Sequence, residues 1–172
     1  GWGDYAFEQL EAAGYSVSSA YTMVRHPERV NFSYRDNLWR GSDLLATGIA
    51  SFGHVSGVHY QNHAEWPQYC GSLEAGELPL DRGLSISPHQ RLVREMILQL
   101  KRGHLDVAYF REKFGVEILD QWRDNWDAYQ TEGLLRIDHE RDRITLTREG
   151  LLRVDSMLPA FFEPQFQGVR YT

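Results

Sequence analysis

Apolar residues in the first third of the chain alternate between helical spacing and continuous runs. Residues 4–13 place Phe7 and Leu10 a turn apart with carboxylates outside, and Gly14 follows, which predicts a short amphipathic helix. Residues 15–24 alternate as in a strand, and residues 42–52 form a mostly apolar run. Such a run is typical of a strand buried on both faces.

The next segments continue this order. Residues 55–62 predict a turn and a short strand, and residues 63–76 predict a helix that carries Trp66, Tyr69 and Leu73 inward. A strand, helix, strand order predicts an α/β fold. One or two buried strands leave sheet edges without partners, so we expect the chain to be an incomplete piece of a longer protein.

From Ser87 the pattern becomes helical. Ser87, Pro88 and Gln90 form a capping box, and the apolar stripe that follows ends near Gly103. Further helices are expected at 106–114 and 116–131. A hairpin follows, in which Leu135 and Ile137 lie opposite Leu146 and Ile144, and Thr147 caps a last helix that runs to Pro159. Three helices, a hairpin and a helix predict a winged-helix-like α+β domain.

These patterns divide the chain into three predicted parts. We expect an α/β part over residues 1–86, the winged-helix-like domain over 87–160 and an aromatic tail over 161–172, with a linker near 76–83. The tail aromatics are expected to cover another surface.

Composition excludes several classes of protein. The 172 residues are 42% hydrophobic, enough to bury a core, but no run approaches the roughly 20 apolar residues of a membrane span and no secretory signal is visible. We therefore expect a cytoplasmic protein. The net charge of −6 disfavours nucleic-acid binding. The predicted third helix agrees, because it sets four carboxylates against one arginine, namely Glu117, Asp120, Asp124 and Asp127 against Arg123.

Few residues suggest chemistry of their own. His54, His59 and His63 with Glu65 are close in sequence, but histidines at hairpin ends and in a helix cap are the favoured interpretation, and no metal site is predicted. The lone Cys70 has no neighbouring cation to lower its pKa, so a packed thiol is favoured over a nucleophile. Glycines over residues 46–57 match no dinucleotide or Walker motif. They either allow close approach of a flat or bulky ligand or merely turn the chain.

The order of segments resembles the C-terminal half of the oxygen-independent coproporphyrinogen III oxidase family, whose members are radical S-adenosylmethionine enzymes. The matching positions of residues 35–62 are Asn37, Trp39, Asp43, Leu44, Leu45, Gly48 and Asn62. Ala46 departs from the family's first glycine, as do Ser51 and Phe52 from its small or branched residues. Residues 132–162 resemble the family's C-terminal domain, with its hairpin and terminal aromatic pair.

The resemblance implies a specific architecture and chemistry. It implies that the first part is a fragment of a partial (β/α) barrel and that a 4Fe-4S cluster and S-adenosylmethionine are held in the intact protein. The cluster cysteines would lie upstream of Gly1, so this chain alone would be inactive, and no residue in it is assigned as catalytic. By similarity, the cofactor or substrate end of the barrel would be lined by Gly48, Ile49, Ala50, Ser51 and Phe52.

The substrate class stays open among relatives of this fold. The first interpretation is an oxidoreductase of haem biosynthesis that acts on coproporphyrinogen III or a related tetrapyrrole. A haem or tetrapyrrole chaperone of the same architecture is the alternative, followed by a winged-helix interaction module. The expected partners are the N-terminal portion of the same protein and a tetrapyrrole, with neither nucleic acid nor a membrane span.

Overall fold

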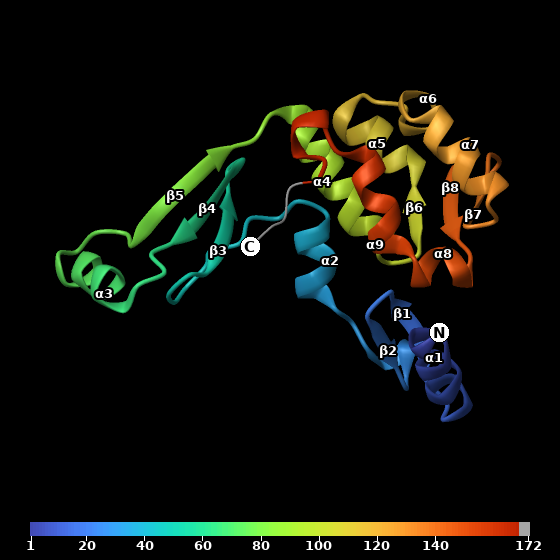
Figure 1. Ribbon diagram of the computed structural model, residues 1–172, viewed down its shortest axis with the longest axis horizontal. Helices are drawn as coiled ribbons and strands as arrows, with labels where there is room; N and C mark the ends of the chain where they lie inside the picture. The colour runs from blue at the N-terminus through green and yellow to red at the C-terminus, as the bar shows by residue number, and fades with distance from the viewer. Residues whose placement is uncertain (169–172) are drawn as a thin grey trace. The chain divides into compact units, whose positions relative to one another are not determined.

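The computed structural model describes residues 1–168, which divide into two compact units (Figure 1). The terminal unit combines Gly1–Ser33 with the chain from Leu92 onward, and the middle unit is Tyr34–Arg91. The units group the chain differently from the boundary expected at residue 86, because residues 1–33 belong to the same unit as the C-terminal helices. The predicted domain limits stay a prediction, and residues 169–172 of the predicted tail lie outside the described residues.

The terminal unit opens with a helix and a hairpin. Helix α1 (Trp2–Ala12) confirms the predicted amphipathic helix, and it lies beside strand β1 (Figure 1). The single strand predicted over residues 15–24 is wrong, since the chain folds into antiparallel strands β1 (Ser16–Ser19) and β2 (Thr22–Val24). The backbone N–H of Tyr21 donates to Ser19 Oγ at 3.2 Å, which holds the turn between them. A short 3₁₀ turn (Pro27–Arg29) follows.

The rest of the terminal unit surrounds a three-stranded antiparallel sheet of order β6-β8-β7. Leu135 pairs with Leu146 and Ile137 with Ile144, which confirms the predicted hairpin, whereas β6 was not predicted. The elements are α4 (Pro88–Leu100), which begins in the middle unit, β6 (His104–Asp106), α5 (Val107–Phe114), α6 (Ile118–Gln121), α7 (Arg123–Thr131), β7 (Leu135–Asp138), β8 (Arg143–Leu146), α8 (Arg148–Leu152), α9 (Val154–Met157) and 3₁₀ turns at Leu158–Phe161 and Pro164–Phe166.

The predicted helix caps are confirmed. The backbone N–H of Gln90 donates to Ser87 Oγ at 3.1 Å, and the N–H of Ser87 donates to Gln90 Oε1 at 3.0 Å, which completes the capping box. Gly115 ends α5 with a φ of 68°, and Thr147 Oγ1 accepts from the N–H of Gly150 at 3.1 Å. Local side chains therefore fix where these helices begin and end.

The single helix predicted over residues 116–131 is wrong. It breaks at Trp122, whose φ of −122° and ψ of 36° leave the helical region. Trp126 Nε1 donates to the carbonyl oxygen of Ile118 at 2.8 Å across the break. The break therefore allows Ile118 and Trp126 to be buried together.

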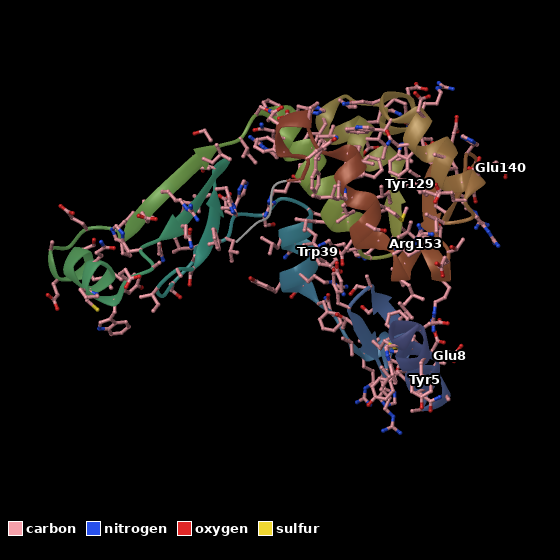
Figure 2. The ribbon with its side chains drawn as sticks, in the orientation of Figure 1. Tyr5, Glu8, Trp39, Tyr129, Glu140 and Arg153 are labelled. Atoms are coloured by element: carbon pink, nitrogen blue, oxygen red, sulfur yellow. The ribbon has the colours of Figure 1, made fainter. Side chains whose placement is uncertain are left out.

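The core of the terminal unit includes both ends of the described chain. Phe7 of α1 belongs to the same buried cluster as the C-terminal helices. Phe161, expected to begin an aromatic tail, is only 2% exposed and packs on Trp126 with ring centroids 4.6 Å apart. Trp122 also contacts Phe161, and the hydroxyl of Tyr129, labelled in Figure 2, donates to the carbonyl of Met157 at 2.9 Å.

The middle unit contains a second three-stranded antiparallel sheet, of order β3-β4-β5 (Figure 1). Its elements are α2 (Ser33–Trp39), β3 (Phe52–Val55), β4 (Val58–Asn62), α3 (Trp66–Glu74) and β5 (Leu80–Ser85). The turn, strand and helix predicted over residues 55–76 are confirmed. The predicted linker at 76–83 is wrong in its second half, because β5 begins at Leu80 and pairs with β4.

The buried strand predicted over residues 42–52 is also wrong. Apart from Phe52, which begins β3, this segment is a loop that contains one isolated β-bridge, between Leu44 and His54. Leu45 is 73% exposed. Trp66 and Leu73, predicted to face inward from α3, are 65% and 49% exposed. The middle unit thus combines a hydrogen-bonded loop with several exposed apolar side chains.

Helices and antiparallel sheets alternate along the chain, so the fold is mixed α and β. The finer descriptions, a partial barrel and a winged helix, stay predictions. Within residues 1–168, no helix is both long enough and apolar enough to cross a membrane.

A candidate ligand-binding loop and sheet

The loop at residues 46–51 holds the residues expected to line a cofactor or substrate. Gly48 has a φ of +96° and Ala50 a φ of +56°, so the chain turns through the left-handed region twice in three residues. Glycine adopts this region at little cost, but alanine does so rarely. The positive φ of Ala50 therefore indicates that surrounding interactions hold the loop in place.

Side chains of β4 and α3 supply those interactions. The hydroxyl of Tyr60 accepts from the backbone N–H of Ala46 at 2.8 Å, and the hydroxyl of Tyr69 accepts from the N–H of Gly48 at 2.9 Å. Asn62, only 2% exposed, donates from Nδ2 to the carbonyl oxygen of Gly48 at 3.0 Å and lies 3.4 Å from that of Ala46. The loop is thus fixed by groups 14 to 21 residues away in sequence.

Backbone bonds complete the attachment at the far end of the loop. The N–H of Ala50 donates to the carbonyl of His63, and the N–H of Asn62 donates to the carbonyl of Ser51, both at 2.9 Å. Ser51 Oγ bonds back to the carbonyl of Thr47 at 2.8 Å. The loop therefore presents a shape that exists before any ligand arrives.

The five predicted site residues are contiguous, but they differ in exposure. Ile49 is 41% exposed at the tip of the loop, and Phe52 is 51% exposed at the start of β3. Gly48 and Ser51 are half-buried. Of these side chains, those of Ile49 and Phe52 offer the most apolar surface to a ligand.

Glycine at position 53 makes room for Tyr60. A Cβ atom at Gly53 would lie 2.2 Å from Cζ of the Tyr60 ring, a separation that no real contact shows. The two residues are direct partners across β3 and β4. Gly53 therefore lets the Tyr60 ring lie over the sheet, with its hydroxyl reaching the loop.

One face of the sheet forms an open, largely apolar groove of about 480 Å³. Tyr60 and Asn62 contribute from β4, next to the exposed Leu45 of the loop. The apolar residues that complete its lining include Val55, Val58, Leu78, Pro79 and Leu80. Its size falls within the range of small-molecule sites.

The opposite face carries a small hollow of about 130 Å³ beside a stacked ring pair. The rings of Phe52 and His59 are 5.7 Å apart between centroids and inclined by 10°. Across the hollow, Arg82 Nε donates to Gln61 Oε1 at 2.8 Å, and Gln61 Nε2 donates to the carbonyl of Ala50 at 3.2 Å. A chain of hydrogen bonds therefore joins the hollow to the loop.

The three histidines considered from the sequence do not come together. His54 and His59 are directly paired within β3 and β4, with ring centroids 6.2 Å apart. His63 lies after β4, and its Nδ1 is 3.6 Å from Asp81 Oδ1. In the described part of the chain, no group of three or more His, Cys, Asp or Glu side chains is placed to hold a metal ion. Cys70 is half-buried on α3.

Sequence reasoning did not assign roles to Tyr60, Gln61 or Arg82. For Tyr69 it predicted an inward-facing position, and the residue is half-buried, but its bond to the loop was not foreseen. Asn62 entered only as a position of the family resemblance, and its bonds to the loop were not foreseen. The alternation of Tyr60 and Asn62 along β4 was the available signal, since residues two apart in a strand face the same side. The partner loop, however, was expected to be a strand.

The comparisons with known proteins first define a class. Residues 86–153 match the family described as the HemN C-terminal domain. The fold resembles that of the solved structure of coproporphyrinogen III oxidase (HemN) from Escherichia coli, described as a radical SAM enzyme. The TM-score is 0.72 at 17% identity, over 91% of this chain and 39% of that one.

Curated relatives give a more particular similarity. An oxygen-independent coproporphyrinogen III oxidase of Pseudomonas aeruginosa is 26% identical over 180 residues, which cover 96% of this chain and 39% of that protein. The protein of the same name from Helicobacter pylori strain J99 is 27% identical over 116 residues, which cover 65% of this chain and 25% of that protein. The predicted resemblance is confirmed: the chain is similar to the C-terminal part of oxygen-independent coproporphyrinogen III oxidases.

Proposed function

We propose that this chain is the C-terminal portion of a radical S-adenosylmethionine oxidoreductase that acts on coproporphyrinogen III or a related tetrapyrrole. The observation that carries the proposal is the coincidence of two features in one segment. Residues 46–52 lie in a stretch with the family resemblance, and the same residues form a loop fixed by Tyr60, Asn62 and Tyr69.

The chain's own residues then have a binding and shaping role. Gly48 allows a ligand to approach the backbone closely, while Ile49 and Phe52 give it an apolar wall. The fixed loop lowers the entropic cost of binding, because its shape does not have to be created by the ligand. S-adenosylmethionine, when bound to a cluster, supplies radical chemistry.

The iron–sulfur cluster itself does not fit the residues of this chain. Such clusters are held by several cysteine thiolates, and the sequence contains one cysteine, Cys70. In this proposal, an N-terminal portion of the same protein holds the cluster and supplies its thiolate ligands. This chain contributes one wall of the site and no thiolate ligand.

The test uses the longer protein encoded with this chain, with its cluster reconstituted. We expect formation of 5′-deoxyadenosine from S-adenosylmethionine and decarboxylation of coproporphyrinogen III. If the longer protein has no cysteine loop and binds haemin without cleaving S-adenosylmethionine, the oxidoreductase proposal is wrong and a chaperone function is supported.

A pair of glycine variants separates the role of the loop from general strain. Gly48→Ala and Gly76→Ala both place alanine at a positive φ, of +96° and +75°, but only the first alters the loop. We expect Gly48→Ala to lower kcat/KM and Gly76→Ala to leave it close to the wild-type value. Equal losses in the two variants would contradict a role for the loop.

A further inference from the structure

Arg82 lines the small hollow, and its side chain is held there through the Nε nitrogen. Its Nε donates to Gln61 Oε1, and among the described residues no carboxylate pairs with its guanidinium group. A guanidinium held in this way keeps its two terminal nitrogens as donors, in the planar fork that matches a carboxylate. The hollow therefore offers one oriented cationic group.

Apart from Gln61 and Gly83, the other residues that line the hollow are aromatic rings or apolar side chains. Phe52 and His59 form the stacked pair, and Leu84, 54% exposed, adds an apolar surface from β5. Exposed aromatic rings favour a flat partner, since ring pairs prefer offset stacking or edge-to-face contact. One cation beside such a surface favours an acidic ligand that carries a flat ring.

The size of the hollow limits how much of a ligand enters it. At about 130 Å³ it is below the range of sites that enclose a whole drug-sized molecule. It accommodates a carboxylate arm and the edge of the ring that bears it. The rest of the ligand would extend toward Ala50, to which Gln61 connects Arg82.

We propose that the Arg82 hollow is a binding subsite for a carboxylate arm of a tetrapyrrole substrate and the flat pyrrole ring that bears it, with Arg82 as the anion-binding residue and Phe52 as the stacking surface. This inference rests on the proposed function and adds a residue that determines specificity. The net charge of −6 opposes the approach of anions, so specific binding would depend on the local arrangement around Arg82.

The experiment measures equilibrium binding of coproporphyrin III to this chain by fluorescence, with two comparison probes. A tetracationic porphyrin, meso-tetra(N-methylpyridinium-4-yl)porphyrin, tests the need for negative charge, and citrate as a competitor tests the need for a flat ring. We expect coproporphyrin III to bind more tightly than the cationic porphyrin, and citrate to compete weakly.

Variants then assign the binding to the hollow. Arg82→Gln should weaken coproporphyrin binding by roughly tenfold or more, as for loss of a charge-assisted hydrogen bond. Arg82→Lys should give a smaller loss, and Phe52→Ala should weaken both porphyrins. Arg141→Gln, which removes an 82% exposed arginine side chain, is the matched control and should bind as the wild type does.

Several outcomes would overturn the inference. One is no measurable binding of coproporphyrin III by the wild-type chain. Another is equal affinity of Arg82→Gln and Arg141→Gln for coproporphyrin III. The third is that citrate displaces coproporphyrin III as effectively as unlabelled coproporphyrin III itself would. Because this readout is binding and not S-adenosylmethionine cleavage, the subsite can fail while the oxidoreductase activity is found, and the reverse.

Discussion

The side chain of Asn62 is joined to the backbone of Gly48 by a 3.0 Å hydrogen bond between Nδ2 and the carbonyl oxygen. Asn62 is buried at the end of β4, whereas Gly48 lies in a loop with a left-handed φ. The same amide nitrogen lies 3.4 Å from the carbonyl of Ala46. One buried carboxamide therefore links the central strand of the middle unit to the candidate ligand-binding loop.

Replacement of this carboxamide should release the loop. Asn62→Ala is expected to lower the free energy of unfolding by about 1–3 kcal/mol, because the carbonyl oxygens of the half-buried Gly48 and Ala46 lose their donor. Hydrogen exchange at Gly48 and Ala50 should accelerate as well. Gln61→Ala is the control, because it removes a half-buried side chain that makes one 3.2 Å bond to the loop, at Ala50, and accepts one bond from Arg82. An effect of Asn62→Ala no larger than that of Gln61→Ala would contradict this assignment.

The aromatic cluster around Phe161 should dominate the stability of the terminal unit. Trp126 is 1% exposed, packs on Phe161 and bonds to the carbonyl of Ile118. Trp126→Ala is expected to lower the free energy of unfolding by about 3–5 kcal/mol, as for other large core truncations. Trp122→Ala should have a smaller effect, because Trp122 is only half-buried. Urea titrations of the two variants decide the order.

A buried carboxylate links α4 to α5. Glu95 is fully buried, accepts a hydrogen bond from the Tyr109 hydroxyl at 2.6 Å and lies 2.8 Å from Lys113 Nζ. Lys113→Ala removes the cationic partner of this buried carboxylate but leaves the Tyr109 hydrogen bond, and the lysine side chain is itself 37% exposed. Lys113→Ala should therefore destabilise the terminal unit by about 1–3 kcal/mol, less than the loss of one partner from a fully buried pair.

A double variant distinguishes the charge from the packing. Glu95→Gln combined with Lys113→Ala removes both charges while it keeps most of the volume at position 95. We expect the double variant to be more stable than Lys113→Ala alone, in thermal or urea unfolding. A double variant that is no more stable than Lys113→Ala would show that packing of the lysine stem, and not the buried charge, explains the loss.

The features that could be predicted from the sequence are the ones set by near neighbours. The capping box of Ser87 and Gln90, the cap at Thr147 and the pairing of Leu135 with Leu146 each depend on residues within one turn or one hairpin. The family resemblance also identified the segment that contains Gly48.

The features that could not be predicted depend on distant partners. The apolar composition of residues 42–52 favoured a strand, but the backbone of this segment bonds to Tyr60, Asn62 and Tyr69, which lie on other elements. The break at Trp122 likewise depends on the tertiary packing of Trp126. Propensity and periodicity carry no information about such contacts. For the same reason, they could not predict that Arg82 lines a hollow.

The hydroxyl of Tyr21 donates to Asp155 Oδ1 at 2.5 Å and thereby joins the N-terminal hairpin to α9. Tyr21 is 55% exposed, as Tyr5 is, but partial desolvation of its phenol raises the pKa above the ordinary value of 10.0, and the hydrogen bond to Asp155 and the charge of Asp155 raise it further. The folded state therefore keeps this proton at a pH where the unfolded chain has lost it. Tyr21 thus stabilises the fold fully below pH 10, and the contribution falls as the pH rises above about 10.

Tyr21→Phe removes this linkage, so the free energy of unfolding of the variant should fall less steeply between neutral and strongly alkaline pH than that of the wild type. Some slope should remain, because burial also raises the pKa of Tyr129. Tyr5→Phe, at an exposed position of α1 labelled in Figure 2, controls for the loss of one phenol. Urea unfolding at a series of pH values measures the slopes, and identical slopes for Tyr21→Phe and Tyr5→Phe would show that the bond to Asp155 does not contribute.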